Sequence, residues 1–227
     1  MPFWGAAPPL GGLCSHDTAP LSRIAVLGAS VSAGFGWDWH EGRERTLADL
    51  MAHSLKPGSV TPRSFASPWF FKDPSAVGGR LVHAVSEYKP TLIIAVDFLF
   101  WFAYGAGLDE AQRLARLEQG LKLLQTLPGP LLVGDLPDMS SAEGKALEPG
   151  MAPSAEVLAK LNQRIAEWTR QRGDSVIVPL GSWTQQGPAR RMLQKDGLHP
   201  TREGGRWIAT KTMEVLRDSC PSMEKGS

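Results

Sequence analysis

Two short stretches of the chain contain residue types that could do nucleophilic chemistry. Ser30 lies in VLGASVSAGFG, residues 26–36, a segment rich in Gly, Ala and Ser that follows an apolar run. Near the other end, DGLHPTREGG places Asp196 three residues before His199. A carboxylate can fix the tautomer of an imidazole, and the imidazole can take the proton of a serine hydroxyl. The three residues could therefore form a Ser-His-Asp triad.

Each stretch also has a simpler interpretation. A Gly-rich loop after a strand can bind a phosphate, but a dinucleotide fingerprint would need glycine at the position of Ser30 or of Val31. The acid that such a fingerprint needs after a second strand is missing as well, since Asp49 lies within a helical pattern. For the second stretch, the alternative is a helix-capping acid beside a surface histidine. The spacing disfavours a dinucleotide site at the first stretch. A helix-capping role for Asp196 beside a surface His199 remains open at the second.

The elements that must position these residues follow from the hydrophobic pattern. Short apolar runs, typical of buried parallel strands, alternate with segments in which apolar residues recur at helical spacing. We expect strands at 24–27, 59–65, 91–96, 131–134 and 176–180, and helices at 45–55, 74–88, 109–127, 154–172 and 202–216. This alternation predicts a three-layer α/β/α sandwich around a five-stranded parallel sheet. Ligands of such sheets bind beyond the carboxyl ends of the strands.

Composition narrows the class of protein. The 227 residues include 24 Lys plus Arg and 23 Asp plus Glu, for a net charge of +1. No run of like charge indicates binding to nucleic acid or to an acidic membrane. No segment reaches the roughly 18 uninterrupted apolar residues of a transmembrane helix. We expect a soluble protein that acts on a small molecule. It has no recognisable signal peptide and is either cytoplasmic or the mature form of a secreted or periplasmic protein.

We expect one domain, at 23–218, with an irregular N-terminal leader at 1–22 and a C-terminal tail at 219–227. Cys14 and Cys220 are the two cysteines, too few for a cysteine-rich zinc site. They are either two free thiols or one bridge that joins the chain ends. Acids and histidines are scattered without the spacing of metal ligands, so we expect no metal and no cofactor.

Together the two stretches resemble the motifs of the SGNH, or GDSL, hydrolase family. Gly28, Ser30 and Gly34 match the first motif, with Ala29 in place of the usual Asp, and the final Asp-x-x-His-Pro motif matches in full at 196–200. The resemblance implies a flavodoxin-like sheet. It also implies that Ser30 is the nucleophile, His199 the general base and acid, and Asp196 the orienting carboxylate.

The middle of the chain departs from the family pattern. The oxyanion hole of such enzymes combines the serine N–H with a glycine N–H after the second strand and an asparagine amide after the third. Here Ala66 or Ser67 stands nearest the glycine, and Asp97 falls where the asparagine is expected. The resemblance gives Ser30, Ala66, Ser67 and Asp97 as oxyanion-hole candidates. Asp97 could donate a hydrogen bond only when protonated, and the alternative is that it bonds backbone N–H groups of the loop.

Aromatic residues are frequent in the three loops at this edge of the sheet. About half of them are expected in the core, and the others could line a cleft for an apolar acyl or aryl group; the candidates are Trp37, Trp69, Phe98 and Trp101. His40 could lie at the rim. Asp135 and Asp138 follow the fourth strand, where capping or turn roles are expected. The resemblance implies a serine esterase that acts on a small-molecule ester. The alternative is a catalytically weak protein of the same fold that binds an acyl or carbohydrate ligand.

Overall fold

Alternate residues of the strands face two separate hydrophobic cores. Ala25 and Leu27 contribute to one core, whereas Ile24 and Val26 contribute to the other. This follows from the two-residue period of a strand, and it requires a layer of helices on each face of the sheet. The computed structural model describes residues 21–37, 45–55, 60–185 and 191–219.

The sheet has five parallel strands, as predicted, and their order is β2-β1-β3-β4-β5. The strands are β1 Ile24–Gly28, β2 Arg63–Ala66, β3 Leu92–Ala95, β4 Leu131–Gly134 and β5 Ser175–Val178. The last strand ends before Leu180, which was expected in it, because Pro179 lacks the N–H that would continue the ladder. Leu180 instead begins helix α6.

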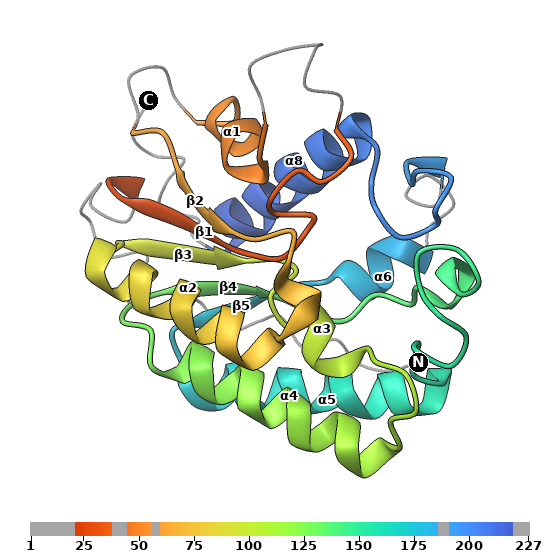
Figure 1. Ribbon diagram of the computed structural model, residues 1–227. Coiled ribbons are helices and arrows are strands. Elements are labelled where there is room, and N and C mark those ends of the chain that lie inside the picture. The colour runs from red at the N-terminus through yellow and green to blue at the C-terminus, as the bar shows by residue number, and fades with distance from the viewer. Residues whose placement is uncertain (1–20, 38–44, 56–59, 186–190, 220–227) are drawn as a thin grey trace.

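The helices form two layers, one on each face of the sheet (Figure 1). One face is covered by α2 (Pro74–Tyr88), α4 (Glu110–Gln125) and α5 (Ala155–Arg172), and the other by α1 (Leu47–Ala52) and α8 (Arg202–Asp218). The short α3 (Phe100–Ala103) and α6 (Leu180–Gln185) follow β3 and β5. Short 3-10 turns occupy Phe70–Lys72 and Ser140–Ala142. The expected α/β/α sandwich is therefore confirmed.

Local sequence signals set the ends of the main helices. Asp109 and Gln112 form a capping box at the start of α4, and the Ser154 side chain accepts a hydrogen bond from the Val157 N–H at the start of α5. At the end of α5, Gly173 adopts a left-handed conformation with φ of 80°. These caps fix where each helix begins and ends, and hence where the loops at the sheet edge start.

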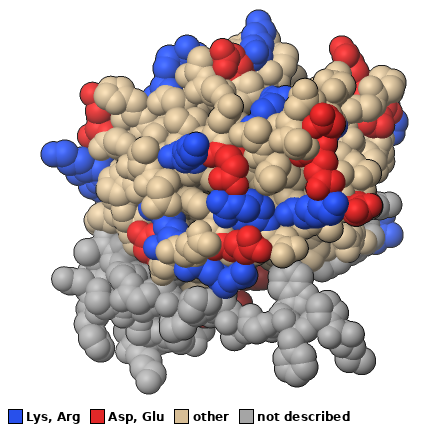
Figure 2. Space-filling model, turned by 90° about the horizontal axis from the view of Figure 1, so that it is seen from below, with Lys and Arg blue, Asp and Glu red and all other residues tan. Residues whose placement is uncertain are grey.

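The outer surface of α4 and α5 carries charges of both signs. Figure 2 shows that Lys and Arg alternate with Asp and Glu on this face of the molecule. Lys160 pairs with Glu110 at 2.9 Å and with Glu156 at 3.0 Å, and Arg164 pairs with Glu118 at 2.5 Å. Among the described residues of this face, charges of the two signs are therefore interspersed. None of the helices among the described residues has the length and apolar character to cross a bilayer.

Candidate active site

The turn after β1 presents Ser30 at the carboxyl edge of the sheet. The Phe35 N–H donates to the Ser30 carbonyl at 2.9 Å, and the Ala33 N–H donates to the Ala29 carbonyl at 2.9 Å, so the chain forms a helical turn directly after the strand. Gly34 closes this turn with φ of 70°, a conformation that favours glycine. Ser30 thus lies at the start of a short, hydrogen-bonded turn with 8% of its surface exposed.

Asp97 lies beneath this turn and holds it. Its Oδ1 accepts hydrogen bonds from the Ala29 N–H at 3.0 Å and the Ser32 hydroxyl at 2.5 Å. Its Oδ2 accepts from the N–H groups of Val31 at 2.8 Å and Ser32 at 3.2 Å. A side chain on Gly28 would collide with this carboxylate and with Ser32, which explains the glycine before the turn. Burial raises the pKa of Asp97, while the bonds from Ser32, Ala29 and Val31 act to lower it.

A second turn presents His199 just before α8. Asp196 Oδ1 accepts hydrogen bonds from the N–H groups of Leu198 at 2.9 Å and His199 at 3.0 Å. Gly197, which lies between Asp196 and Leu198, adopts φ of 73°. The Thr201 side chain accepts a hydrogen bond from the Gly204 N–H and starts α8. Asp and Gly are typical of such turns, because the Asp side chain caps the following N–H groups and Gly tolerates positive φ.

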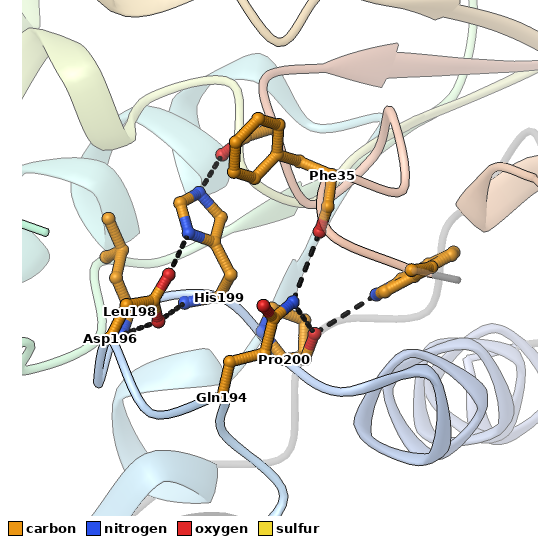
Figure 3. A network of polar contacts seen from close by, with 8 residues as sticks. Phe35, Gln194, Asp196, Leu198, His199 and Pro200 are labelled. Carbon is orange, nitrogen blue, oxygen red and sulfur yellow. Dashed lines mark hydrogen bonds and ion pairs between the residues drawn. The ribbon is translucent and has the colours of Figure 1, made fainter. Parts of the chain in front are cut away.

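The structure brings Ser30, His199 and Asp196 together as one hydrogen-bonded chain. His199 Nδ1 lies 2.7 Å from Asp196 Oδ2, and His199 Nε2 lies 3.1 Å from Ser30 Oγ. Figure 3 shows the imidazole between these two contacts, one at each ring nitrogen. Burial acts to raise the pKa of Asp196, but hydrogen bonds from His199 and Leu198 hold it below its usual range. Asp196 is therefore an ionised acceptor near neutral pH.

Gln194, which the sequence analysis did not single out, joins the two turns. Its Nε2 donates to the Phe35 carbonyl at 3.3 Å and to the Pro200 carbonyl at 2.9 Å (Figure 3). The Trp37 indole N–H donates to the same Pro200 carbonyl at 3.1 Å. These bonds connect segments that are about 160 residues apart and fix the distance between Ser30 and His199. No local sequence signal marks Gln194, because the partner through which it joins the two turns, Phe35, lies near the other end of the chain.

Known structures share this architecture, although the sequence matches no protein-family model and no curated protein. A lipase/acylhydrolase from Enterococcus faecalis superposes with a TM-score of 0.62 at 18% identity, over 85% of this chain and 94% of that one. A lipolytic protein of the G-D-S-L family from Desulfitobacterium hafniense superposes with a TM-score of 0.59 at 8% identity, over 86% of this chain and 99% of that one. A catalytic mutant of an acetylxylan esterase from Geobacillus stearothermophilus superposes with a TM-score of 0.56 at 16% identity, over 86% of this chain and 94% of that one.

The chain has the SGNH hydrolase fold. The resemblance expected from the two motifs is thus confirmed at the level of architecture.

Within this SGNH fold, Asp97 does not occupy the oxyanion position that the resemblance implies. Both of its oxygens accept hydrogen bonds from the turn after β1, which is the alternative role given for Asp97 above. The Ser67 N–H, a second candidate, donates to the Gly28 carbonyl at 3.1 Å and continues the ladder. Ala66 is paired with Gly28 inside the sheet. The backbone of Ser67 and the side chain of Asp97 are therefore not retained as oxyanion donors.

The aromatic candidates of this SGNH fold divide between core and surface. Trp37 is 3% exposed and Phe98 is fully buried, so both pack in the core rather than line a cleft, which corrects the expectation. Trp69 is 59% exposed and lies against Phe71, with ring centroids 6.2 Å apart. Trp101 lines a cavity next to Ser30.

The ring of Phe35 lies against the imidazole of His199. Its ring centroid lies 4.7 Å from that of His199, and half of its surface is exposed. Phe35 therefore forms part of the open side of the site. His40, Cys14 and Cys220 lie outside the described residues.

Asp135 follows β4 and caps the start of α6, as a capping role predicts. Its Oδ1 accepts a hydrogen bond from the Gly181 N–H at 2.7 Å. Burial raises the pKa of Asp135 to about 6 from 3.8, although hydrogen bonds from Gly181 and Leu180 oppose the shift. The folded protein therefore holds a proton between about pH 4 and pH 6 that the unfolded chain has released, so stability falls as pH rises through this window.

We expect Asp135→Asn to remove this pH dependence. Asn keeps an acceptor oxygen for the Gly181 N–H and carries no charge. The variant should exceed the wild type by up to about 3 kcal/mol in free energy of unfolding above pH 7, with the difference vanishing near pH 4. Urea unfolding of both proteins at pH 4 and pH 7.5 measures this. A constant difference at the two pH values would contradict the assignment.

Proposed function

We propose that the protein is a serine hydrolase that cleaves carboxylic esters through an acyl-enzyme. The observation that carries this proposal is the hydrogen-bonded chain from Ser30 through His199 to Asp196, at 3.1 Å and 2.7 Å. It lies at the carboxyl edge of a sheet whose fold is shared with esterases and acylhydrolases. Nucleophile, base and orienting carboxylate are each within reach of the next.

Each residue has one role in the proposed reaction. Ser30 Oγ attacks the ester carbonyl carbon while its proton passes to His199 Nε2, and the carbonyl electrons move to the oxygen. The tetrahedral intermediate then collapses, the bond to the alcohol oxygen breaks, and His199 returns the proton to the leaving alcohol. Water repeats the two steps on the acyl-enzyme and releases the acid. Asp196 remains ionised throughout and stabilises the imidazolium.

The developing oxyanion needs donors that are not otherwise engaged. We propose the Ser30 N–H, which lies at the start of the helical turn after β1. The Ser67 hydroxyl is our second candidate: its oxygen accepts a hydrogen bond from the Trp69 N–H, and its own proton can be donated. Ser67 lies one residue beyond the Gly28–Ala66 pair, beside the nucleophile turn.

A second function is a protein of this fold that binds an acyl or carbohydrate ligand with little turnover. What favours it is the altered oxyanion hole, where the carboxylate of Asp97 and the N–H of Ser67 are engaged elsewhere. Ground-state binding does not need these donors, whereas transition-state stabilisation does.

A fluorophosphonate probe separates the two functions. It reacts with serines that a neighbouring base activates, so we expect stoichiometric labelling at Ser30, with the labelled residue located by fragmenting the modified peptide in a mass spectrometer. The matched controls are Ser32, which is fully buried and bonded to Asp97, and the Ser30→Ala variant; both should remain unlabelled. A protein that binds an ester without hydrolysing it and resists labelling would contradict the esterase proposal.

A further inference from the structure

Beside Ser30 lies a partly enclosed cavity of about 80 Å³ with almost entirely apolar walls. Its walls come from α3, the loop after β4, α6, the turn before His199, and α8, and include Phe100, Met139, Leu180, Trp183, Leu198 and Ile208. Two carboxylates, Asp97 and Asp135, also border it, but Asp97 accepts hydrogen bonds from the turn after β1 and Asp135 accepts one from the N–H of Gly181. A cavity with such walls favours an apolar group over water.

The triad decides which half of an ester faces the cavity. His199 must give its proton to the leaving alcohol, so the alcohol has to lie on the imidazole side of Ser30. Phe35 packs against the imidazole and half of its surface is exposed, so the imidazole side of Ser30 is open to solvent. His199 does not line the cavity, whereas Ser30 does. The cavity is therefore placed to take the acyl group.

The volume limits the length of that acyl group. A cavity of roughly 150 Å³ accepts benzene, which has six carbons, so about 80 Å³ accommodates about three carbons beyond the carbonyl. We propose that the site selects esters of short apolar acids of about four carbons, such as butanoate. This inference rests on the proposed esterase function and narrows its substrate class.

Part of the cavity wall is held by contacts to a buried residue, Tyr104. Tyr104 is 1% exposed, and its hydroxyl donates to the Pro137 carbonyl at 2.6 Å and accepts from the Met139 N–H at 3.1 Å. Its ring stacks on Phe100 with centroids 4.0 Å apart. Pro137, Met139 and Phe100 all line the cavity. This buried tyrosine thus holds three parts of the wall in place.

A series of p-nitrophenyl esters tests the inference, because the leaving group stays constant while the acyl chain grows. Each buried methylene contributes about fourfold, so we expect kcat/KM for the butanoate, which has two more methylenes, to exceed that for the acetate about fifteenfold. The decanoate should fall at least tenfold below the butanoate, because its chain exceeds the cavity.

Two variants should move this optimum in opposite directions. Ile208→Phe fills the cavity and should make the acetate the better substrate, whereas Leu180→Ala enlarges it and should move the optimum to the hexanoate. Leu158→Ala is the matched control: Leu158 and Leu180 are both 8% exposed, but Leu158 does not line the cavity. The control should keep the wild-type profile despite a similar loss of stability.

The outcomes distinguish this inference from the proposed function. If the fluorophosphonate labels Ser30 but the chain-length profile is flat, favours acetate or favours decanoate, the short-acyl inference is overturned and the esterase proposal stands. An unchanged optimum in folded Leu180→Ala also overturns it. Neither labelling nor hydrolysis of any ester would overturn both. Opposite shifts in the two cavity variants, with an unchanged control, would support the inference.

Discussion

Replacing Ser30 by Ala is expected to lower kcat for the preferred p-nitrophenyl ester by about 10⁴-fold to 10⁶-fold, with little change in melting temperature. The Ser30 hydroxyl makes one hydrogen bond, to His199, and supports no core packing. His199→Ala should have a similar effect, and the double variant should lose no more than either single one, because the two side chains act as one unit. Steady-state kinetics of the three variants measures this.

The control for this prediction is Ser86→Ala on α2. Ser86 is partly buried and its hydroxyl donates to the Val82 carbonyl at 3.0 Å, so the change removes a comparable hydrogen bond outside the site. Its kcat should match the wild type. Retention of more than a few per cent of wild-type turnover by Ser30→Ala would mean that another residue is the nucleophile.

Replacing Asp97 by Ala is expected to destabilise the protein by about 3–5 kcal/mol and to reduce activity in the fraction that folds. The change leaves three backbone N–H groups and the Ser32 hydroxyl without their acceptor. These groups flank Ser30, so the turn that presents Ser30 loses the side chain that anchors it. Urea unfolding and kcat of the purified variant measure the two effects. Asp138→Ala is the control, because this more exposed carboxylate accepts a bond from the Ser140 N–H and should cost about 1 kcal/mol.

Asp97→Asn separates anchoring from oxyanion stabilisation. An amide offers one acceptor oxygen where the turn needs two, so at least one backbone N–H loses its partner, and we expect lower kcat with a pH profile parallel to that of the wild type. Were Asp97 instead a protonated oxyanion donor, wild-type activity would fall as pH rises through its raised pKa, and Asn would restore a donor. A gain for Asp97→Asn at alkaline pH would therefore contradict the anchoring role.

The fold could be predicted from the sequence because its signals are local and periodic. Continuous apolar runs such as Ile24–Leu27 indicate strands that are buried on both faces, and the caps at Asp109, Ser154 and Gly173 determine helix ends through bonds to near neighbours. The second strand was placed less well, because edge strand β2 is only partly buried and has a weaker apolar pattern. Chain order then places the Ser30 and His199 turns at the same edge of the sheet.

Tertiary structure decided what the side chains in those turns do. The sequence does not distinguish an acid at position 97 that faces the oxyanion from one that faces the turn. In the folded chain Asp97 is buried under Ala29, Val31 and Ser32 and accepts their hydrogen bonds, so it anchors the turn. Likewise, apolar spacing marks Trp37 and Trp101 equally, and both are buried in the core, yet only Trp101 also lines the cavity. These outcomes depend on contacts between segments 60 or more residues apart. The sequence alone determined the architecture and singled out Ser30, Asp196 and His199, and only the folded chain decided the distances between them, the anchoring role of Asp97 and the cavity.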